Sequence, residues 1–265
     1  MSVFSSICRN KNLIMQLAKR DILVKYRGSI LGKIWAILNP LIMLIIYTIV
    51  FGEIFKSKWG NTENESTFIF GLTLFTGMIV YNLFSEVLSR SATIIQSNVN
   101  YVKKIIFPLE ILVVVLMLTA LFNGLISLIV LIIMNVFLGQ ALSWTIFLIP
   151  VVLFPIILLS MGLAWFLAAL GVFFKDTNYI VTLILQIVLF LSPVFYSIEN
   201  VPDYLKGIYN FNPLGIVIQQ MREIVLWGEI PDWIQWANIT SISILIFVAG
   251  YYFFIKLKGA FADVI

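Results

Sequence analysis

The chain has 265 residues, of which 61% are hydrophobic and only 11% are charged, and its formal net charge is +4. Soluble domains carry about a quarter charged residues, so this composition excludes a soluble protein and predicts an integral membrane protein. The sequence contains no histidine and one cysteine, Cys8. It therefore excludes a histidine proton relay, histidine metal ligands and an internal disulfide for this chain alone, and no catalytic or metal-ligating residue is predicted.

Residues 1–33 form the most basic segment, with seven of the chain's 17 lysines and arginines. We expect a cytoplasmic interfacial helix within residues 13–27, although Lys25 interrupts its amphipathic pattern. Its apolar side is predicted to consist of Leu13, Leu17 and Val24, with Ile14 and Ala18 beside them. Gly28 and Gly32 then allow the chain to turn into the first span. The charges alone fit a topology signal, a lipid-binding helix or a docking surface for a partner.

Long uncharged runs predict six membrane-spanning helices, since one crossing needs ~20 mostly apolar residues. The run from 111 to 174 is too long for one crossing, and we divide it where a glycine, a glutamine and a serine interrupt it at 137–144. The fold class is therefore an all-α polytopic membrane protein with one permease domain over 34–265. Its spans are predicted at about 34–52, 67–85, 111–137, 146–174, 177–198 and 236–255.

The distribution of lysine and arginine predicts that both termini are cytoplasmic. Thirteen of the 17 basic residues fall on the side of the termini, and four fall on the other side: Lys56, Lys58, Lys206 and Arg222. Cytoplasmic loops carry such an excess of positive charge. An even number of spans agrees with this placement, because it returns the chain to the side on which it began.

Two connecting segments are too long to be simple turns. The cytoplasmic segment 86–110 mixes apolar and basic residues and ends near Pro108. On the outer side, Ser192-Pro193 interrupts the fifth span after about 16 residues, or ~24 Å of helix, which is short of the ~30 Å hydrocarbon core. We expect the backbone to break there and residues 193–228 to form short outer helices that line an exit. The alternative is a proline kink in a lipid-facing helix.

Several kinds of chemistry are missing from the sequence. The predicted spans contain no Asp, Glu, Lys or Arg, which argues against an ion-coupled carrier. An Asp-x-Asp pair is also missing, which argues against a membrane glycosyltransferase. Without a Gly-x4-Gly-Lys-Ser/Thr loop the chain cannot hydrolyse ATP by that route. Energy for any active transport must come from another polypeptide.

Three blocks occur in an order that resembles one family. They read "VKYRGSILGKIWAILNPLIMLIIYTIVFGEIF" (24–55), "QSNVNYVKKIIFPLEIL" (96–112) and "FLSPVFYSIENVPDYLKGIYNFNPLGIVIQQMREIVLWG" (190–228), and "FADVI" closes the chain. Together they are similar to type 2 ABC exporter permeases, the transmembrane subunits that export O-antigen, capsule and teichoic acid polymers. The stretch "EILVVV" departs from relatives that carry a proline soon after Glu-Ile-Leu.

The resemblance implies a homodimer in the bacterial cytoplasmic (inner) membrane, paired with two copies of a separate nucleotide-binding ATPase that holds ATP and Mg. It implies no cofactor in this chain, no nucleic acid partner, and contact with membrane lipids. The implied cargo is a polysaccharide on an undecaprenyl-type lipid carrier, with O-antigen first and capsule or wall teichoic acid as alternatives. A non-transporting scaffold for polymer synthesis, and an exporter of small drugs or lipids, are rival functions.

The resemblance also places functional residues in three groups. An ATPase-coupling segment comprises Asn98, Tyr101, Lys103, Lys104, Phe107 and Pro108, for which positive-inside topology is the alternative role. A cytoplasmic entrance gate comprises Arg20, Lys25, Tyr26 and Arg27. An outer gate and channel comprise Ser192, Pro193, Phe195, Tyr196, Asn212, Pro213 and Arg222. Phe195 and Tyr196 are expected to stack on sugar rings, and Arg222 either meets the carrier's pyrophosphate or pairs with Glu223 or Glu199 across the dimer.

Overall fold

The computed structural model describes residues 3–27, 29–55, 59, 67–103 and 107–264, so Gly28 and Lys104 lie outside the described residues. Throughout these ranges the regular secondary structure is helical, which confirms the all-α prediction. The α-helices are α1 (Val3–Arg9), α2 (Lys11–Tyr26), α3 (Trp35–Tyr47), α4 (Thr67–Ser91), α5 (Val99–Val102), α6 (Ile111–Phe137), α7 (Ile149–Phe173), α8 (Thr177–Leu191), α9 (Asp203–Asn210), α10 (Pro213–Arg222), α11 (Trp233–Leu257) and α12 (Phe261–Val264).

Five helical stretches in the described chain are long and apolar enough to cross a membrane. They coincide with five of the six predicted spans: Gly32–Ile54, Thr67–Ser91, Ile111–Phe137, Trp144–Phe173 and Trp233–Val264. The helix in the remaining predicted span, α8, has 15 residues, or ~22 Å. It ends at Leu191, and Ser192 is extended (φ −102°, ψ 144°). The predicted break before Pro193 is therefore present, and the short helices α9 and α10 follow it.

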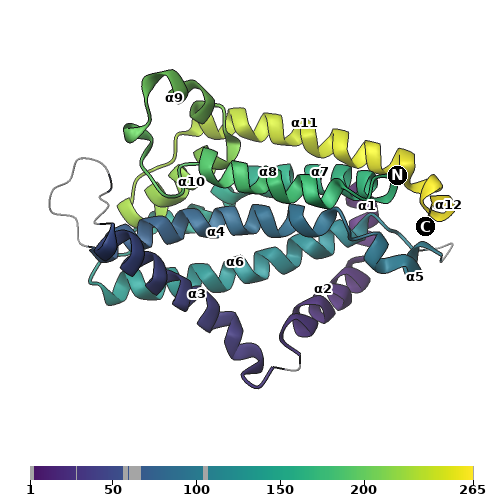
Figure 1. Ribbon diagram of the computed structural model, residues 1–265, viewed down its shortest axis with the longest axis horizontal. Coiled ribbons are helices and arrows are strands. Elements are labelled where there is room, and N and C mark those ends of the chain that lie inside the picture. Colours follow the sequence, from purple (N-terminus) through teal and green to yellow (C-terminus); the bar gives the residue numbers. More distant parts are fainter. Residues whose placement is uncertain (1–2, 28, 56–58, 60–66, 104–106, 265) are drawn as a thin grey trace.

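Both chain termini lie at one end of the helical bundle, beside α1, α5 and α12 (Figure 1). We call this the terminal end; α9 lies toward the opposite, distal end. Helices α2 and α3 lie along one edge of the bundle and converge at a point away from it, while α11 runs along the opposite edge. The shared position of the termini agrees with the even number of predicted spans.

Helix α4 is the central element of the packing. In its most apolar stretch 78% of the residues are buried, against 17% for the stretch that contains α3. The hydroxyls of Thr73 and Thr76 donate to the carbonyls of Ile69 and Leu72 one turn earlier, which satisfies them inside the core. Helix α4 also continues to Ser91, so Glu86 and Arg90 belong to a helix and not to the predicted cytoplasmic loop.

Helices α7 and α11 cross closely at two glycines. A Cβ atom built on Gly162 would lie 2.6 Å from the carbonyl oxygen of Ile246, and one on Gly250 would overlap the carbonyl of Gly162. Near the crossing the Trp165 ring makes edge contacts with Phe247 and Tyr251, with ring centroids 5.1 Å apart in both cases. Small residues at such crossings allow the backbones to approach closely, which is a common way to pack membrane helices.

We expect Gly250→Ala to lower the free energy of unfolding by about 1–3 kcal/mol, because the added methyl group forces the two helices apart. Gly259→Ala is the matched control, since a Cβ atom there meets nothing within 4 Å. The measurement is the thermal unfolding midpoint of the purified full-length chain. Equal midpoints for the two variants would show that the crossing tolerates a larger separation.

Candidate functional site

At the terminal end, α2 packs against the first turns of α6. Ile14, Leu17 and Ala18 are buried against Ile111 and Val115. The predicted apolar side was partly wrong, because Val24 is 58% exposed and does not belong to this face. The sequence pattern placed the helix against a membrane surface, whereas the start of α6 supplies the apolar partner for the buried face.

The charged face of α2 bonds to α4 and α6. The Arg90 guanidinium donates to both carboxylate oxygens of Asp21 at 2.8 Å, and the Thr119 hydroxyl donates to Asp21 at 2.9 Å. The Lys25 ammonium lies 3.2 Å from the Glu86 carboxylate. Asn123 donates to both oxygens of that carboxylate at 2.8 and 2.9 Å. We call these six residues the α2 polar network: Asp21, Lys25, Glu86, Arg90, Thr119 and Asn123.

Three of the four predicted entrance-gate residues contact neighbouring helices. Arg20 donates to the Tyr101 hydroxyl at 2.8 Å, and its guanidinium carbon lies 5.9 Å from the centre of that ring. Lys25 belongs to the α2 polar network. The Tyr26 hydroxyl donates to Asn123 at 3.3 Å, and burial, followed by the Glu86 charge, raises the pKa of Tyr26. Arg27 is exposed.

The predicted coupling segment contains the short helix α5. The rings of Tyr101 and Phe107 stack with centroids 4.3 Å apart, and the Asn98 side chain donates to the Ile94 carbonyl. The Pro108 carbonyl accepts a hydrogen bond from the amide of Ile111, at the start of α6. Lys103 is exposed. Because Arg20 bonds to Tyr101, the structure joins the predicted entrance gate to the predicted coupling segment.

Glu110 forms a second connection at the terminal end, which no pattern in the sequence predicted. Its carboxylate accepts from the Ser6 hydroxyl at 2.8 Å and from the Lys258 ammonium at 2.7 Å, while its carbonyl accepts from the Trp165 indole. Burial raises the pKa of Glu110, but the bonds from Lys258, from the backbone amide of Glu110 and from Ser6, together with the Lys258 charge, outweigh burial and hold this pKa below its ordinary value. These bonds tie α1 and the end of α11 to the start of α6, directly after the coupling segment.

At the distal end, Asn212 joins the break after α8 to the start of α10. Its side-chain oxygen accepts from the amides of Leu214 and Gly215 at 3.1 and 3.3 Å, which is the bonding of a helix N-cap. Its side-chain nitrogen donates to the Ser192 hydroxyl at 2.9 Å and to the Leu191 carbonyl at 3.2 Å. Pro213 follows as the first residue of α10, where its missing N–H costs nothing.

Arg222 is fully buried against the same break. Its guanidinium donates to the carbonyls of Pro193 at 2.7 Å, Val194 at 2.9 Å and Thr73 at 3.0 Å. Its guanidinium carbon lies 4.1 Å from the centre of the Trp59 ring, a cation–π contact. Burial lowers the pKa of Arg222 to about 9, so the group is charged at neutral pH.

The sequence predicted that Arg222 meets a pyrophosphate or pairs with Glu223 or Glu199. Neither prediction included these backbone carbonyls. Within the described chain the guanidinium bonds to carbonyl oxygens of the break and of α4, and no ion pair to Glu199 or Glu223 is formed. The guanidinium can lie this close to α4 because residue 77 is a glycine. A Cβ atom there would lie 2.7 Å from the Arg222 Nη2. Glycine in a transmembrane helix is common, so the sequence carried no signal for this pair.

Phe195 and Tyr196 are held by the same distal region. The Phe195 ring stacks on Phe51, with centroids 5.3 Å apart. The Tyr196 hydroxyl donates to the Phe190 carbonyl and lies 2.7 Å from the Tyr209 hydroxyl. Both rings therefore contact other residues of this chain near the end of α8. Their stacking on sugar rings stays a prediction.

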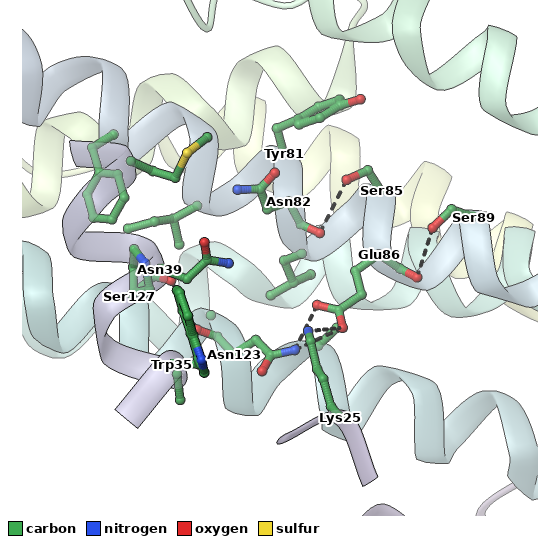
Figure 2. A pocket seen from close by; sticks show the side chains of 18 of the residues that line it. Lys25, Trp35, Asn39, Tyr81, Asn82, Ser85, Glu86, Ser89, Asn123 and Ser127 are labelled. Carbon is green, nitrogen blue, oxygen red and sulfur yellow. Dashed lines mark hydrogen bonds and ion pairs between the residues drawn. The ribbon is translucent and has the colours of Figure 1, made fainter. Parts of the chain in front are cut away.

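A cavity of about 740 Å³ lies between α3, α4, α6 and α8, with Lys25 and Glu86 along one side. Figure 2 shows Lys25, Glu86 and Asn123 meeting beside this space, while Asn39 and Asn82, which also line the cavity, lie above them in this view. The cavity combines aromatic and aliphatic side chains with uncharged polar ones. Such a lining can take a ligand that is partly apolar and partly hydrogen-bonding.

Comparisons with known proteins give a consistent result. The family described as "ABC-2 type transporter" matches residues 12–226. The chain is 25% identical over 255 residues to the O-antigen export system permease protein RfbA of Myxococcus xanthus, and 26% identical over 265 residues to RfbA of Klebsiella pneumoniae, covering 96% of this chain and 95% of each relative. It is also 25% identical over 256 residues to the polysialic acid transport protein KpsM of Escherichia coli, covering 91% of this chain and 93% of the relative.

Replacing Arg222 by methionine should lower the free energy of unfolding by about 3 kcal/mol, because three buried carbonyls lose a charged donor. Gly77→Ala should cost less, since the guanidinium can shift. Lys206→Met is the control, because Lys206 bonds to Asp203, which is exposed. Thermal unfolding of the purified chain measures the three effects, and an Arg222→Met midpoint equal to that of the control would contradict the assignment.

Acidification should loosen α1, because the depressed pKa of Glu110 gives its bonds a defined pH dependence. Their contribution to stability is fully present above the ordinary pKa of 4.5 and is lost as the pH falls through the lower folded-state pKa. Glu110→Gln should lower the protection of the α1 amides against hydrogen exchange by about tenfold at neutral pH, with protection measured relative to the intrinsic exchange rate at the same pH, and the parent chain should show a similar loss of protection in acid. Asp263→Asn, which changes an exposed carboxylate, is the control. Equal exchange of the α1 amides in both variants would show that Glu110 does not hold α1 in place.

Proposed function

The chain belongs to the ABC-2 type transporter family, and from this membership we propose that it is the permease subunit of an ATP-driven exporter of a lipid-linked cell-envelope polysaccharide. The observation that carries the proposal is the similarity over almost the full chain to relatives named as polysaccharide export proteins. Two copies of this chain would form the permease in the bacterial cytoplasmic membrane, with both termini in the cytoplasm. The proposed carrier lipid is of the undecaprenyl type.

A separate ATPase is the proposed energy source. The chain has no phosphate-binding loop of the Gly-x4-Gly-Lys-Ser/Thr type, so ATP and Mg would be bound by two partner subunits. The terminal end offers a route by which such a partner could act on the permease. Force on α5 would pass through the Tyr101–Arg20 bond to α2, and from α2 to α4 and α6 through the α2 polar network.

The distal end supports the second half of this proposal. The short helices α9 and α10 follow the break in α8, and Arg222 ties that break to the central helix α4. A rearrangement of α4 would therefore move the break and the helices that follow it together. We propose that Ser192, Pro193, Phe195, Tyr196, Asn212 and Pro213 belong to an outer gate and that Arg222 holds this gate to α4.

O-antigen is the first choice of cargo, because two of the similar proteins are named O-antigen export permeases. Capsular polysaccharide is the alternative that the polysialic acid relative favours, and wall teichoic acid remains within the same class. A membrane scaffold for polymer synthesis is the rival without transport. Co-purification with an ATPase whose activity rises on assembly supports the exporter, whereas stable purification without any ATPase supports the scaffold.

The double variant Lys103→Glu/Lys104→Glu should insert normally but lose at least about tenfold of the partner's ATPase stimulation, since like charges at a docking surface cost several kcal/mol. Lys175→Glu, an exposed charge reversal in the turn before α8, is the control for altered topology. The measurement is ATP hydrolysis by the reconstituted complex beside export by cells. Normal export by the double variant would return these lysines to a purely topological role.

A further inference from the structure

The cavity between α3, α4, α6 and α8 contains three side-chain carboxamides that have no hydrogen-bond partner among the described residues: Asn39, Asn82 and Gln186. All three are exposed in the single chain. Asn123, by contrast, bonds to Glu86 and Tyr26. A free carboxamide in a membrane span is costly unless water, a ligand or another chain bonds to it. Three of them around one cavity therefore call for an occupant.

Asn82 and Gln186 lie at the same depth in the bundle. Each is nine residues from the terminal end of its helix, α4 or α8, or ~14 Å along the axis. The preceding residues are bonded to each other, since the buried Tyr81 hydroxyl donates to the Leu185 carbonyl at 3.0 Å. That bond aligns the two helices and places both carboxamides at one level, well inside the apolar part of the chain.

The chemistry of the cavity selects among ligands. Each carboxamide both donates and accepts hydrogen bonds, as sugar hydroxyls do. Trp35, 40% exposed, lines the same cavity and offers a flat face to the apolar side of a sugar ring. Among the described lining residues Lys25 is the one cation, and it is already paired with Glu86. A carboxylate or phosphate would find no free positive charge there.

We propose that this cavity is a binding site for an uncharged, hydroxyl-rich segment of glycan, contacted by Asn39, Asn82 and Gln186. The inference rests on the proposed export function and deepens it, because it favours a neutral polysaccharide over a polyanionic one as cargo. Lys25 and Glu86 close one side of the site by binding each other. Because an ion pair has no net charge, it leaves the cavity neutral and suited to successive uncharged sugars.

The test uses the full chain in lipid nanodiscs and two probes of equal length, maltohexaose and a hexamer of sialic acid. The readout is the change in tryptophan fluorescence that disappears in Trp35→Phe. We expect saturable binding of maltohexaose and at least about tenfold weaker binding of the sialic acid hexamer. The triple variant Asn39→Leu/Asn82→Leu/Gln186→Leu should weaken maltohexaose binding by about tenfold or more, because several hydrogen bonds are lost.

Asn238→Leu is the matched control, because Asn238 is an exposed carboxamide on α11, away from the cavity. Equal binding by the triple variant, tighter binding of the sialic acid hexamer, or no binding by the parent chain would overturn the site. Loss of self-association in the triple variant, seen by native mass spectrometry, would also overturn it by assigning the carboxamides to a contact between copies. If the triple variant fails to fold, the single variant Asn82→Leu takes its place, and unchanged binding by it overturns the site.

Failure of this inference is distinguishable from failure of the proposed function. Export by cells that carry the triple variant, at the parent rate, would overturn the site while leaving the exporter intact. Absence of any ATPase partner and of export by the parent chain would overturn the exporter. Binding of maltohexaose that depends on the three carboxamides would still support the site in that case.

Discussion

The structure depends on one buried cation. The Arg222 guanidinium lies just beyond the end of helix α8, where the carbonyls of the broken backbone need donors, and it bonds to Pro193, Val194 and the α4 carbonyl of Thr73. A cation near the C-terminal end of a helix is also favoured by the helix dipole. Because lipid cannot hydrogen-bond a broken backbone, such a break is stable only where protein or water satisfies it. Arg222 thus makes the interrupted helix possible and fastens it to the core.

A comparable constraint acts at the terminal end, where two of the four cations of α2 are bonded within the chain. Arg20 meets Tyr101, and Lys25 meets Glu86. These pairs are partly exposed, so each contributes little to stability by itself. These bonds instead fix the position of α2, since they connect it to α4, α5 and α6 at defined residues. A ligand phosphate that approached Lys25 would have to compete with Glu86 for it.

The candidate site could be predicted from the sequence where a residue type has one strong local preference. Ser192-Pro193 marked a break, because proline lacks an N–H. The capping role of Asn212 was not predicted, although asparagine is a common N-cap residue. The partners of Arg222 could not be predicted, because Thr73 contributes a backbone carbonyl and Gly77 contributes the absence of a side chain. Glu110 stood at a span end like other acids, and its bonds to Ser6 and Lys258 join residues far apart in the chain.

Composition and run length by themselves determined the membrane class, the helical fold and the approximate positions of five long apolar helices, since a bilayer requires about 20 apolar residues per crossing and satisfied backbone bonds. Three ordered blocks determined the family. Only the tertiary structure decided that α2 packs on α6, that Arg222 bonds to the broken helix, and that Asn39, Asn82 and Gln186 meet around one cavity. These arrangements depend on how separate helices approach one another, and a single sequence does not encode that approach in any local pattern.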